Sequence, residues 1–184
     1  SGKSLDPLSL PAELLTALEA LYGHYAKTFE LWENEGIGVP PVFIVVCNNT
    51  STSELIYKYV SGFHRENDDG STTLENGRLA LFRNYDDFGN RIARPNTILI
   101  DSAQLESGEA LDKDFREMAA DEIERFRREM IERTGDMHAG DAIDEATLLR
   151  EVMNTVGKKG KLGEQIRCVV SVSMLTEAGM QTPS

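Results

Sequence analysis

Hydroxyl and amide side chains gather directly after the most apolar segment of the chain. The run VFIVVCNN is followed by the turn TSTSE, so that Asn49, Thr50 and Ser51 stand at the predicted start of a helix. Free backbone N–H groups and the helix dipole at such a position attract anions. The pattern predicts either a phosphate contact or ordinary helix capping, in which Ser51 and Glu54 would form a capping box.

A second candidate for phosphate contact is the glycine-rich segment GKKGKLG at residues 157–163. It carries Lys158, Lys159 and Lys161 in a chain whose net charge is −12. Lysines in such a loop can contact a nucleic-acid backbone without reading its bases. An exposed turn with no ligand is the alternative interpretation of the same residues.

The other motifs give no support for catalysis. The opening SGKS ends like a P-loop, but the strand and upstream glycine that a P-loop needs do not precede it in this sequence. The three histidines are scattered, and the carboxylates of residues 112–133 alternate with arginines as on a solvated helix. We therefore expect no ATPase activity, no catalytic residue, no bound cofactor and no metal site in this chain.

Composition limits the class of protein further. A chain of 184 residues, 40% of them hydrophobic, can bury one core without metals or disulfides. Its acidity argues against a free-standing nucleic-acid binder, which needs Lys and Arg to neutralise phosphates. Cys47 and Cys168 lie in apolar runs and are expected to be buried thiols in a reducing compartment. No signal peptide or membrane span is recognisable, so a soluble, cytoplasmic protein is expected.

Hydrophobic periodicity predicts strands alternating with helices. The expected helices cover residues 11–35, 51–63, 111–133 and 144–156, and the expected strands cover residues 42–49, 78–84, 97–101 and 166–175, with a surface loop or hairpin at 64–77. This alternation predicts an α/β fold of three layers, with a mostly parallel sheet and helices on both faces. The long apolar run at 42–49 is typical of a central strand that is covered on both sides.

Four segments resemble a known family: VFIVVCNNTSTSELIYKYVSGF, NTILIDSAQLESGEALD, EIERFRREM and LLREVMNTVGKKGKLGEQIRCVVSVSMLTE. They are similar to the second motor domain of the restriction subunit of type III restriction enzymes, among the DEAD/DEAH-like helicases. The resemblance runs from about residue 40 to residue 177 and is most specific in its last third.

The resemblance implies a RecA-like domain that acts on double-stranded DNA with several partners. An upstream P-loop domain would share ATP and Mg²⁺ with it, a downstream domain would be the nuclease, and a modification (methyltransferase) subunit would complete the enzyme. Residues 42–49 with the hydroxyls after them match helicase motif IV, and residues 169–177 match the start of motif V. Ser173, Thr176 and Glu177 thereby join the implied DNA contacts.

The resemblance also implies how the chain is divided. Residues 1–39 would be a helical segment packed on the partial domain at 40–177, residues 111–156 a helical insertion, and residues 178–184 a tail. In the family, motif V continues with Gly-Trp-Asp, whereas this chain reads Ala178, Gly179 and Met180. We therefore expect a truncated half-motor whose sheet is incomplete at its C-terminus.

Truncation there would expose an edge or an apolar face of the strand at 166–175, which would favour a homodimer or leave the fragment marginally stable. The alternative is a non-catalytic α/β interaction or scaffold domain, with the charged helix at 112–133 as its docking surface.

Overall fold

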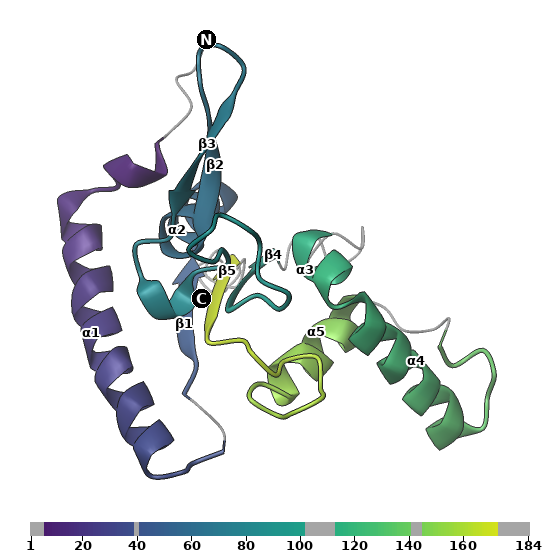
Figure 1. Ribbon diagram of the computed structural model, residues 1–184. Coiled ribbons are helices and arrows are strands. Elements are labelled where there is room, and N and C mark those ends of the chain that lie inside the picture. Colours follow the sequence, from purple (N-terminus) through teal and green to yellow (C-terminus); the bar gives the residue numbers. More distant parts are fainter. Residues whose placement is uncertain (1–5, 39–40, 102–112, 141–144, 173–184) are drawn as a thin grey trace, which may run out of the picture.

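A parallel sheet forms the centre of the molecule. The computed structural model describes residues 6–38, 41–101, 113–140 and 145–172. Within them, three strands form this sheet in the order β1 (Phe43–Cys47), β5 (Cys168–Val172) and β4 (Thr97–Asp101). Helices flank both of its faces (Figure 1). The predicted α/β class, the parallel sheet and the helices on both faces are therefore confirmed.

The middle strand of the described sheet is β5, not β1. Phe43 and Thr97 both pair with Cys168, so all three strands run in one common register. The side chains of Ile44 and Val46 on β1 are 56% and 63% exposed. The predictions of a central strand at 42–49 and of a free edge at 166–175 are both wrong. An apolar run shows that a strand can be buried on both faces, but it does not show which strand has two neighbours.

The first face of the sheet is covered by α1 (Ala12–Asn34), α2 (Thr50–Ser61) and the short 3-10 helix η2 (Ala80–Phe82). Its core is rich in aromatic rings, with the Tyr25 and Phe82 centroids 4.9 Å apart. The Tyr25 hydroxyl donates a hydrogen bond to the carbonyl of Pro41 at 2.8 Å. The predicted α1 is confirmed, although Leu21 is exposed because it lies at the flank of the buried stripe rather than within it.

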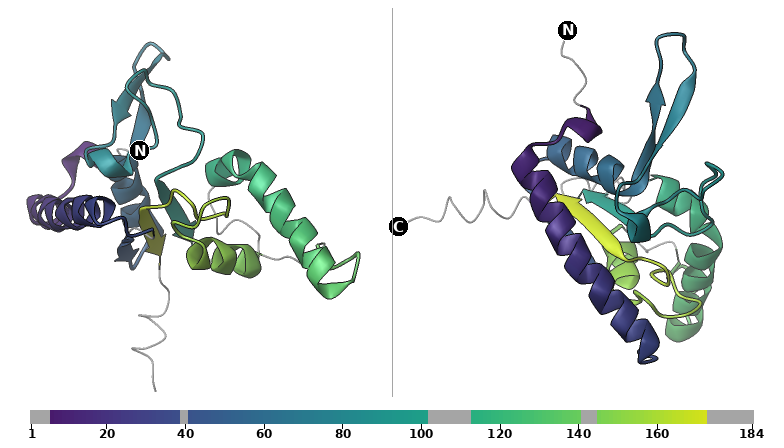
Figure 2. Two further views of the ribbon diagram at one scale, coloured as in Figure 1. Left: turned by 60° about the horizontal axis from the view of Figure 1, so that its bottom comes forward. Right: turned by 60° about the vertical axis from the view of Figure 1, so that its left-hand side comes forward.

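The second face is covered by α3 (Lys113–Met118), α4 (Ala120–Thr134) and α5 (Glu145–Asn154) (Figure 2). The single helix predicted at 111–133 is divided, because the backbone of Ala119 leaves helical geometry at φ −99° and ψ 14°. The core on this face is aliphatic apart from two phenylalanines. Its buried members are Ile98, Ile100, Phe115, Ala119, Phe126, Leu148, Val152, Val156, Leu162, Ile166 and Val169.

A hairpin of β2 (Gly62–Glu66) and β3 (Thr72–Asn76) projects from the body of the molecule (Figure 1). The hairpin confirms the surface loop or hairpin predicted for residues 64–77. The strand predicted at 78–84 is wrong, because the chain there forms η2. Leu79 and Phe82 are both buried, and a spacing of three residues directs two side chains to one side of a 3-10 turn.

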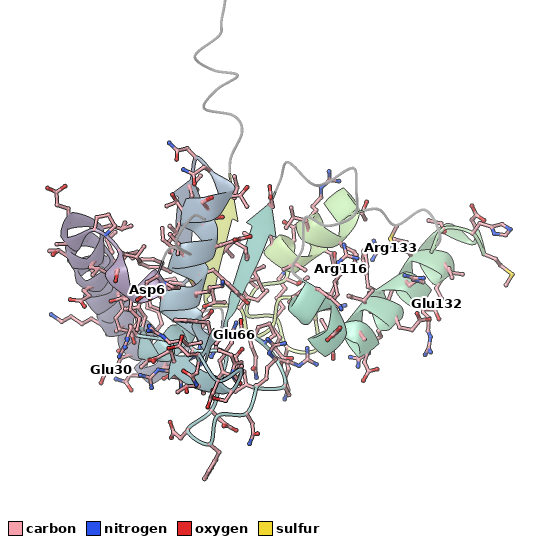
Figure 3. The ribbon with its side chains drawn as sticks, turned by 90° about the horizontal axis from the view of Figure 1, so that it is seen from above. Asp6, Glu30, Glu66, Arg116, Glu132 and Arg133 are labelled. Atoms are coloured by element: carbon pink, nitrogen blue, oxygen red, sulfur yellow. The ribbon has the colours of Figure 1, made fainter. Side chains whose placement is uncertain are left out.

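Charged side chains occupy the periphery. Glu30 on α1 and Glu132 on α4 are exposed, and Figure 3 shows them at the outside of the molecule. The buried Glu122 of α4 pairs with Arg94, which precedes β4, and so ties the second helical layer to the sheet. Within the described ranges, none of the helices combines the length and apolarity that crossing a membrane requires.

Candidate nucleic-acid interface

The predicted polar turn lies at the carboxyl edge of the sheet. In a parallel sheet the carboxyl ends of all strands meet at one edge, where open α/β sheets bind their ligands. Helix α2 begins at Thr50, shortly after β1 ends. The Thr50 hydroxyl lies 3.4 Å from the Oδ2 atom of Asp101, the last residue of β4. The turn therefore reaches across the end of β5 to the far strand.

Asn49, not Ser51, caps helix α2. The Asn49 side-chain oxygen accepts a hydrogen bond from the Thr52 N–H at 2.8 Å, and the Asn49 backbone is extended. The Ser53 hydroxyl donates to the Thr50 carbonyl at 2.7 Å. The capping box predicted for Ser51 and Glu54 is therefore wrong. Asn caps a helix as well as Ser does, so Asn49 can take the place that the prediction gave to Ser51.

The turn offers neutral donors to a ligand rather than cations. Thr50 and Ser51 are exposed in the first turn of α2, where N–H groups have no partner within the helix. The carboxylate of Asp101 lies beside them and reduces the positive potential of the helix N-terminus. A phosphate at this turn would be held by hydroxyl and N–H groups, against one neighbouring negative charge.

The lysine loop at residues 157–163 is a compact turn packed on α5. The Gly157 N–H donates to the Gly163 carbonyl at 3.0 Å, and the Gly163 N–H donates to the Thr155 hydroxyl oxygen at 3.0 Å. A Cβ atom at Gly163 would lie 2.3 Å from the Val152 carbonyl oxygen. Only glycine allows this approach, so packing explains the glycine at position 163.

Only two of the three predicted lysines in this loop are exposed. Lys158 and Lys159 face solvent, whereas the Lys161 ammonium lies 3.3 Å from the Glu129 carboxylate of α4. Arg125 of α4 also donates a hydrogen bond to the Gly160 carbonyl at 3.4 Å. These contacts dock the loop on α4, so it is not the fully exposed turn of the alternative interpretation.

The structure does not bring the two groups of predicted residues together. Asn49, Thr50 and Ser51 lie at the carboxyl edge, whereas the lysine loop precedes β5 and so lies at the amino edge. Strand β5 ends at Val172 between its two neighbours. The predicted contacts at Ser173, Thr176 and Glu177 lie outside the described residues, as does the tail at 178–184. A single phosphate track through both the turn at 49–51 and the lysine loop would have to cross the whole sheet.

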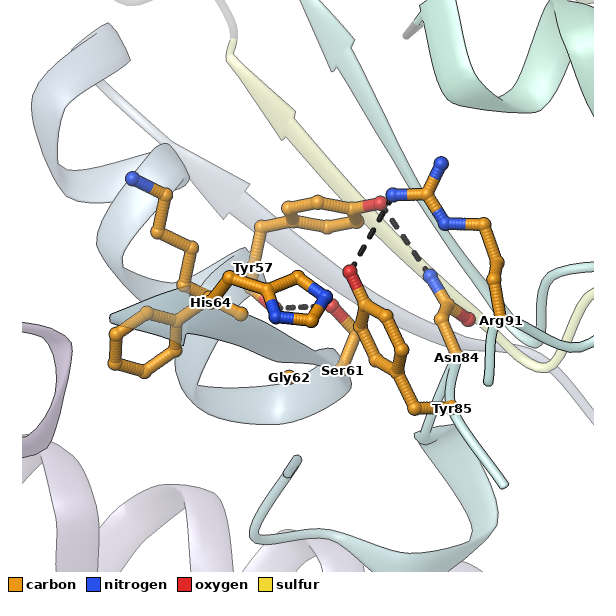
Figure 4. Close-up of a pocket in the computed structure, with 9 residues that line it drawn as sticks. Tyr57, Ser61, Gly62, His64, Asn84, Tyr85 and Arg91 are labelled. Atoms are coloured by element: carbon orange, nitrogen blue, oxygen red, sulfur yellow. Dashed lines mark hydrogen bonds between the residues drawn. The ribbon is translucent and has the colours of Figure 1, made fainter. Parts of the chain in front are cut away.

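Sequence reasoning missed a polar cavity of about 180 Å³ beside the C-terminal end of α2 (Figure 4). Its lining residues are Tyr57, Lys58, Ser61, Gly62, Phe63, His64, Asn84, Tyr85 and Arg91. They come from α2, from β2 and from the segment at 84–91, so no spacing in the sequence marks them as a set. The only signal was the density of Tyr, Arg and Asn in a segment that had been predicted as part strand and part connection.

Thiol and metal chemistry find no support among the described residues. Both cysteines are free and buried, as predicted. Burial raises the pKa of the Cys168 thiol to about 12 and also raises the pKa of Cys47, so both thiols stay protonated near neutral pH. No group of three or more His, Cys, Asp or Glu side chains in this part of the chain has a geometry that would hold a metal ion.

No protein-family model, curated protein or solved structure matches this chain.

Proposed function

We propose that this chain is a RecA-like half-motor of an ATP-dependent DNA translocase, similar to the second motor domain of type III restriction subunits. The turn of Asn49, Thr50 and Ser51 contacts the backbone of one DNA strand, and a separate P-loop domain binds ATP and Mg²⁺. One observation carries the proposal. This turn lies at the carboxyl edge of a parallel sheet, where ligands of open α/β sheets bind.

The pairing of strands supports the same proposal. The segment similar to motif IV forms β1, and the segment similar to motif V includes β5. These strands are parallel neighbours, with Cys47 opposite Val172 at their last pair. The two strands therefore end at the same edge of the sheet. Separate segments placed in this way are suited to contact successive phosphates of one strand.

The proposed contact is weak and neutral, which suits a motor that must release DNA at each step. Hydroxyl and N–H donors position a phosphate without neutralising it, so few counterions are released on binding. The net charge of −12 opposes DNA at long range. The P-loop domain therefore supplies most of the affinity, and Lys158 and Lys159, at the opposite edge, are not part of this contact.

The test is DNA binding by fluorescence anisotropy at about 50 mM salt, where phosphate contacts are strongest. The double variant Thr50→Val, Ser51→Ala removes both hydroxyls and keeps the Asn49 cap. We expect it to weaken binding to every DNA sequence by at least about tenfold, because the loss of even one hydrogen bond to a charged group has an effect of that size. The control is Thr72→Val, an exposed threonine on the hairpin. An affinity that the double variant leaves unchanged, or an equal loss in the control, would reject the proposal.

A second candidate function is a protein interaction domain, and the uncovered side of β1 favours it. Ile44 and Val46 expose more than half of their side-chain surface on a strand that is the edge of the described sheet. Pairing of two β1 strands in a homodimer would cover the free edge and bring the Ile44 and Val46 side chains of the two copies side by side on one face of the joined sheet. Light scattering on a sizing column tests this function, because Val46→Lys should convert a dimer into monomers. A monomeric parent chain would exclude the homodimer.

A further inference from the structure

We propose that a second cavity, at the C-terminal end of α1, binds a small organic cation, an ammonium group on an apolar body. The cavity has a volume of about 230 Å³. Trp32 of α1 and Ile37 after it form one side, and Glu164 and Arg167 from the segment before β5 form the other. Figure 2 shows these two parts of the chain side by side. The turn at 49–51 is not part of the lining, so the proposal does not depend on the proposed DNA contact.

The end of α1 builds the apolar side of the cavity. The Ile37 N–H donates to the Trp32 carbonyl at 2.9 Å, and the Gly36 N–H donates to the Glu33 carbonyl at 3.2 Å. Gly36 has φ +70°, which glycine adopts without strain. These two bonds define a Schellman motif, in which the residue after the glycine often contacts the residue whose carbonyl it binds. The motif therefore fixes Trp32 and Ile37 in one wall without any ligand.

Arg167 forms the opposite wall and is held on all sides. Its N–H donates to the Asn96 carbonyl at 2.7 Å, and its carbonyl accepts from the Phe43 N–H at 2.8 Å. Its guanidinium lies 4.6 Å from the centroid of the Phe29 ring and donates to the Leu81 carbonyl at 3.2 Å. Phe29, which also lines the cavity, thus already carries a cation on its face. The Trp32 ring is the second aromatic group of the lining.

The charges of the lining favour one further cation. Two carboxylates, Glu33 and Glu164, and one basic group, Arg167, leave an excess of one negative charge. Glu164 lies 3.9 Å from Arg94, whose guanidinium also pairs with the buried Glu122. A monovalent cation would make the lining neutral.

Glu33 and the end of its helix define where the cation binds. Glu33 is exposed and forms no ion pair with any residue that the structure describes. The last turn of α1 contains no basic residue, so no side chain within it offsets the negative end of the helix dipole. Both effects attract positive charge to the side of the cavity that Trp32 occupies.

Size and aromatic chemistry define the body of the ligand. A cavity of about 150 Å³ accommodates benzene, so about 230 Å³ holds one six-membered ring with a short chain that ends in an ammonium group. The indole of tryptophan binds cations more strongly than the other aromatic side chains do. A carboxylate accepts a short, strong hydrogen bond from an ammonium group. A protonated aromatic amine combines these features.

Titration of the full chain with phenethylammonium, followed by the fluorescence of Trp32, tests the proposal. Trp32 is the single tryptophan of the chain, so its signal reports on this cavity alone. We expect a saturable change. The anion 3-phenylpropionate has the same ring and the opposite charge, and it should bind at least about tenfold more weakly. Ethylammonium, which lacks the ring, should also bind about tenfold more weakly because it buries less apolar surface.

Matched variants locate the binding site. Glu33→Gln should weaken binding of phenethylammonium by about threefold, the size expected for an exposed ion pair. The control is Glu30→Gln, which removes the same charge from an exposed position of the same helix outside the lining. Trp32→Leu keeps an apolar side chain and should weaken binding by about fivefold, measured by calorimetry.

Three results would overturn the proposal. The first is a titration with phenethylammonium that gives no saturable change. The second is 3-phenylpropionate binding as tightly as phenethylammonium. The third is equal affinity of Glu33→Gln and Glu30→Gln for phenethylammonium.

Discussion

The two faces of the sheet are covered to different extents. On the first face, α1 and α2 reach all three strands, since Phe43, Val45, Leu99 and Cys168 contact one common core. On the second face, α3 to α5 pack over β4 and β5, and the side chains of Ile44 and Val46 stay exposed.

Chain connectivity explains this difference. The connection from β1 to β4 crosses the sheet in one direction, and the connection from β4 back to β5 returns in the other. Crossovers between parallel strands are almost always right-handed, so opposite directions place their helices on opposite faces. Helices between neighbouring β4 and β5 lie over those two strands. How far helices cover a strand therefore depends on which crossover connections pass over that strand.

The largest expected effect tests the aromatic core of the first face. Phe82 is completely buried and its ring contacts those of Tyr22, Tyr25 and Phe43. We expect Phe82→Ala to lower the free energy of unfolding by about 3–5 kcal/mol, because a large cavity remains. Urea denaturation measures this change. The matched control is Phe88→Ala, whose ring is 90% exposed, and an equal loss in both variants would contradict the described core.

A pair of isoleucines on the second face tests its uneven coverage. Ile98 on β4 is 1% exposed beneath the second helical layer, whereas Ile44 on β1 is mostly exposed. Ile98→Ala should destabilise the chain by about 2–5 kcal/mol. Ile44→Ala should change stability by less than about 0.5 kcal/mol. Comparable denaturant midpoints for the two variants would show that β1 is covered on this face too.

A third variant tests how the lysine loop is attached to the second face. The buried Thr155 hydroxyl accepts a hydrogen bond from the Gly163 N–H and donates to the Glu151 carbonyl at 2.6 Å. Thr155→Val leaves the Gly163 donor buried without its partner, which costs about 1–3 kcal/mol. Amide hydrogen exchange should accelerate at Gly157 and Gly163. Unchanged exchange at both glycines would mean that the loop is held by other contacts.

The smallest expected effect concerns the start of α2 on the first face. Asn49→Ala removes the side-chain cap and should lower the free energy of unfolding by about 1 kcal/mol. Ser51→Ala should change it by less than about 0.5 kcal/mol, since Ser51 is an exposed residue of the first helical turn. Thermal denaturation of the two variants under the same conditions compares them. A larger loss in Ser51→Ala would restore the capping box predicted from the sequence.

Local patterns in the sequence predict most of the elements. The buried residues of α1, including Leu18, Tyr25 and Phe29, follow the helical period, and the apolar runs at 42–49 and 97–101 become strands. The predicted burial of Cys47 and Cys168 is confirmed. These features depend on residues close in sequence, so periodicity and residue type are enough to find them.

The candidate sites are less predictable, because they depend on contacts between distant segments. The pairing of Lys161 with Glu129 joins residues 32 positions apart, and the bond from Asn84 to Tyr57 joins residues 27 positions apart. Nothing in either neighbourhood marks its partner. The sequence predicted three free lysines and missed the cavity for this same reason.

Alternating strands and helices, and a polar turn after the most apolar strand, follow from local sequence patterns. The hydrogen bonds and the side-chain periodicity of helices and strands involve residues a few positions apart, so a short stretch of sequence is enough to predict these elements. Three features depend on the tertiary structure. Strand β5 lies between β1 and β4, and one side of β1 stays uncovered. Tyr57, His64 and Arg91 line one cavity. Those outcomes depend on which distant surfaces bury the most apolar area together, a property of the whole chain.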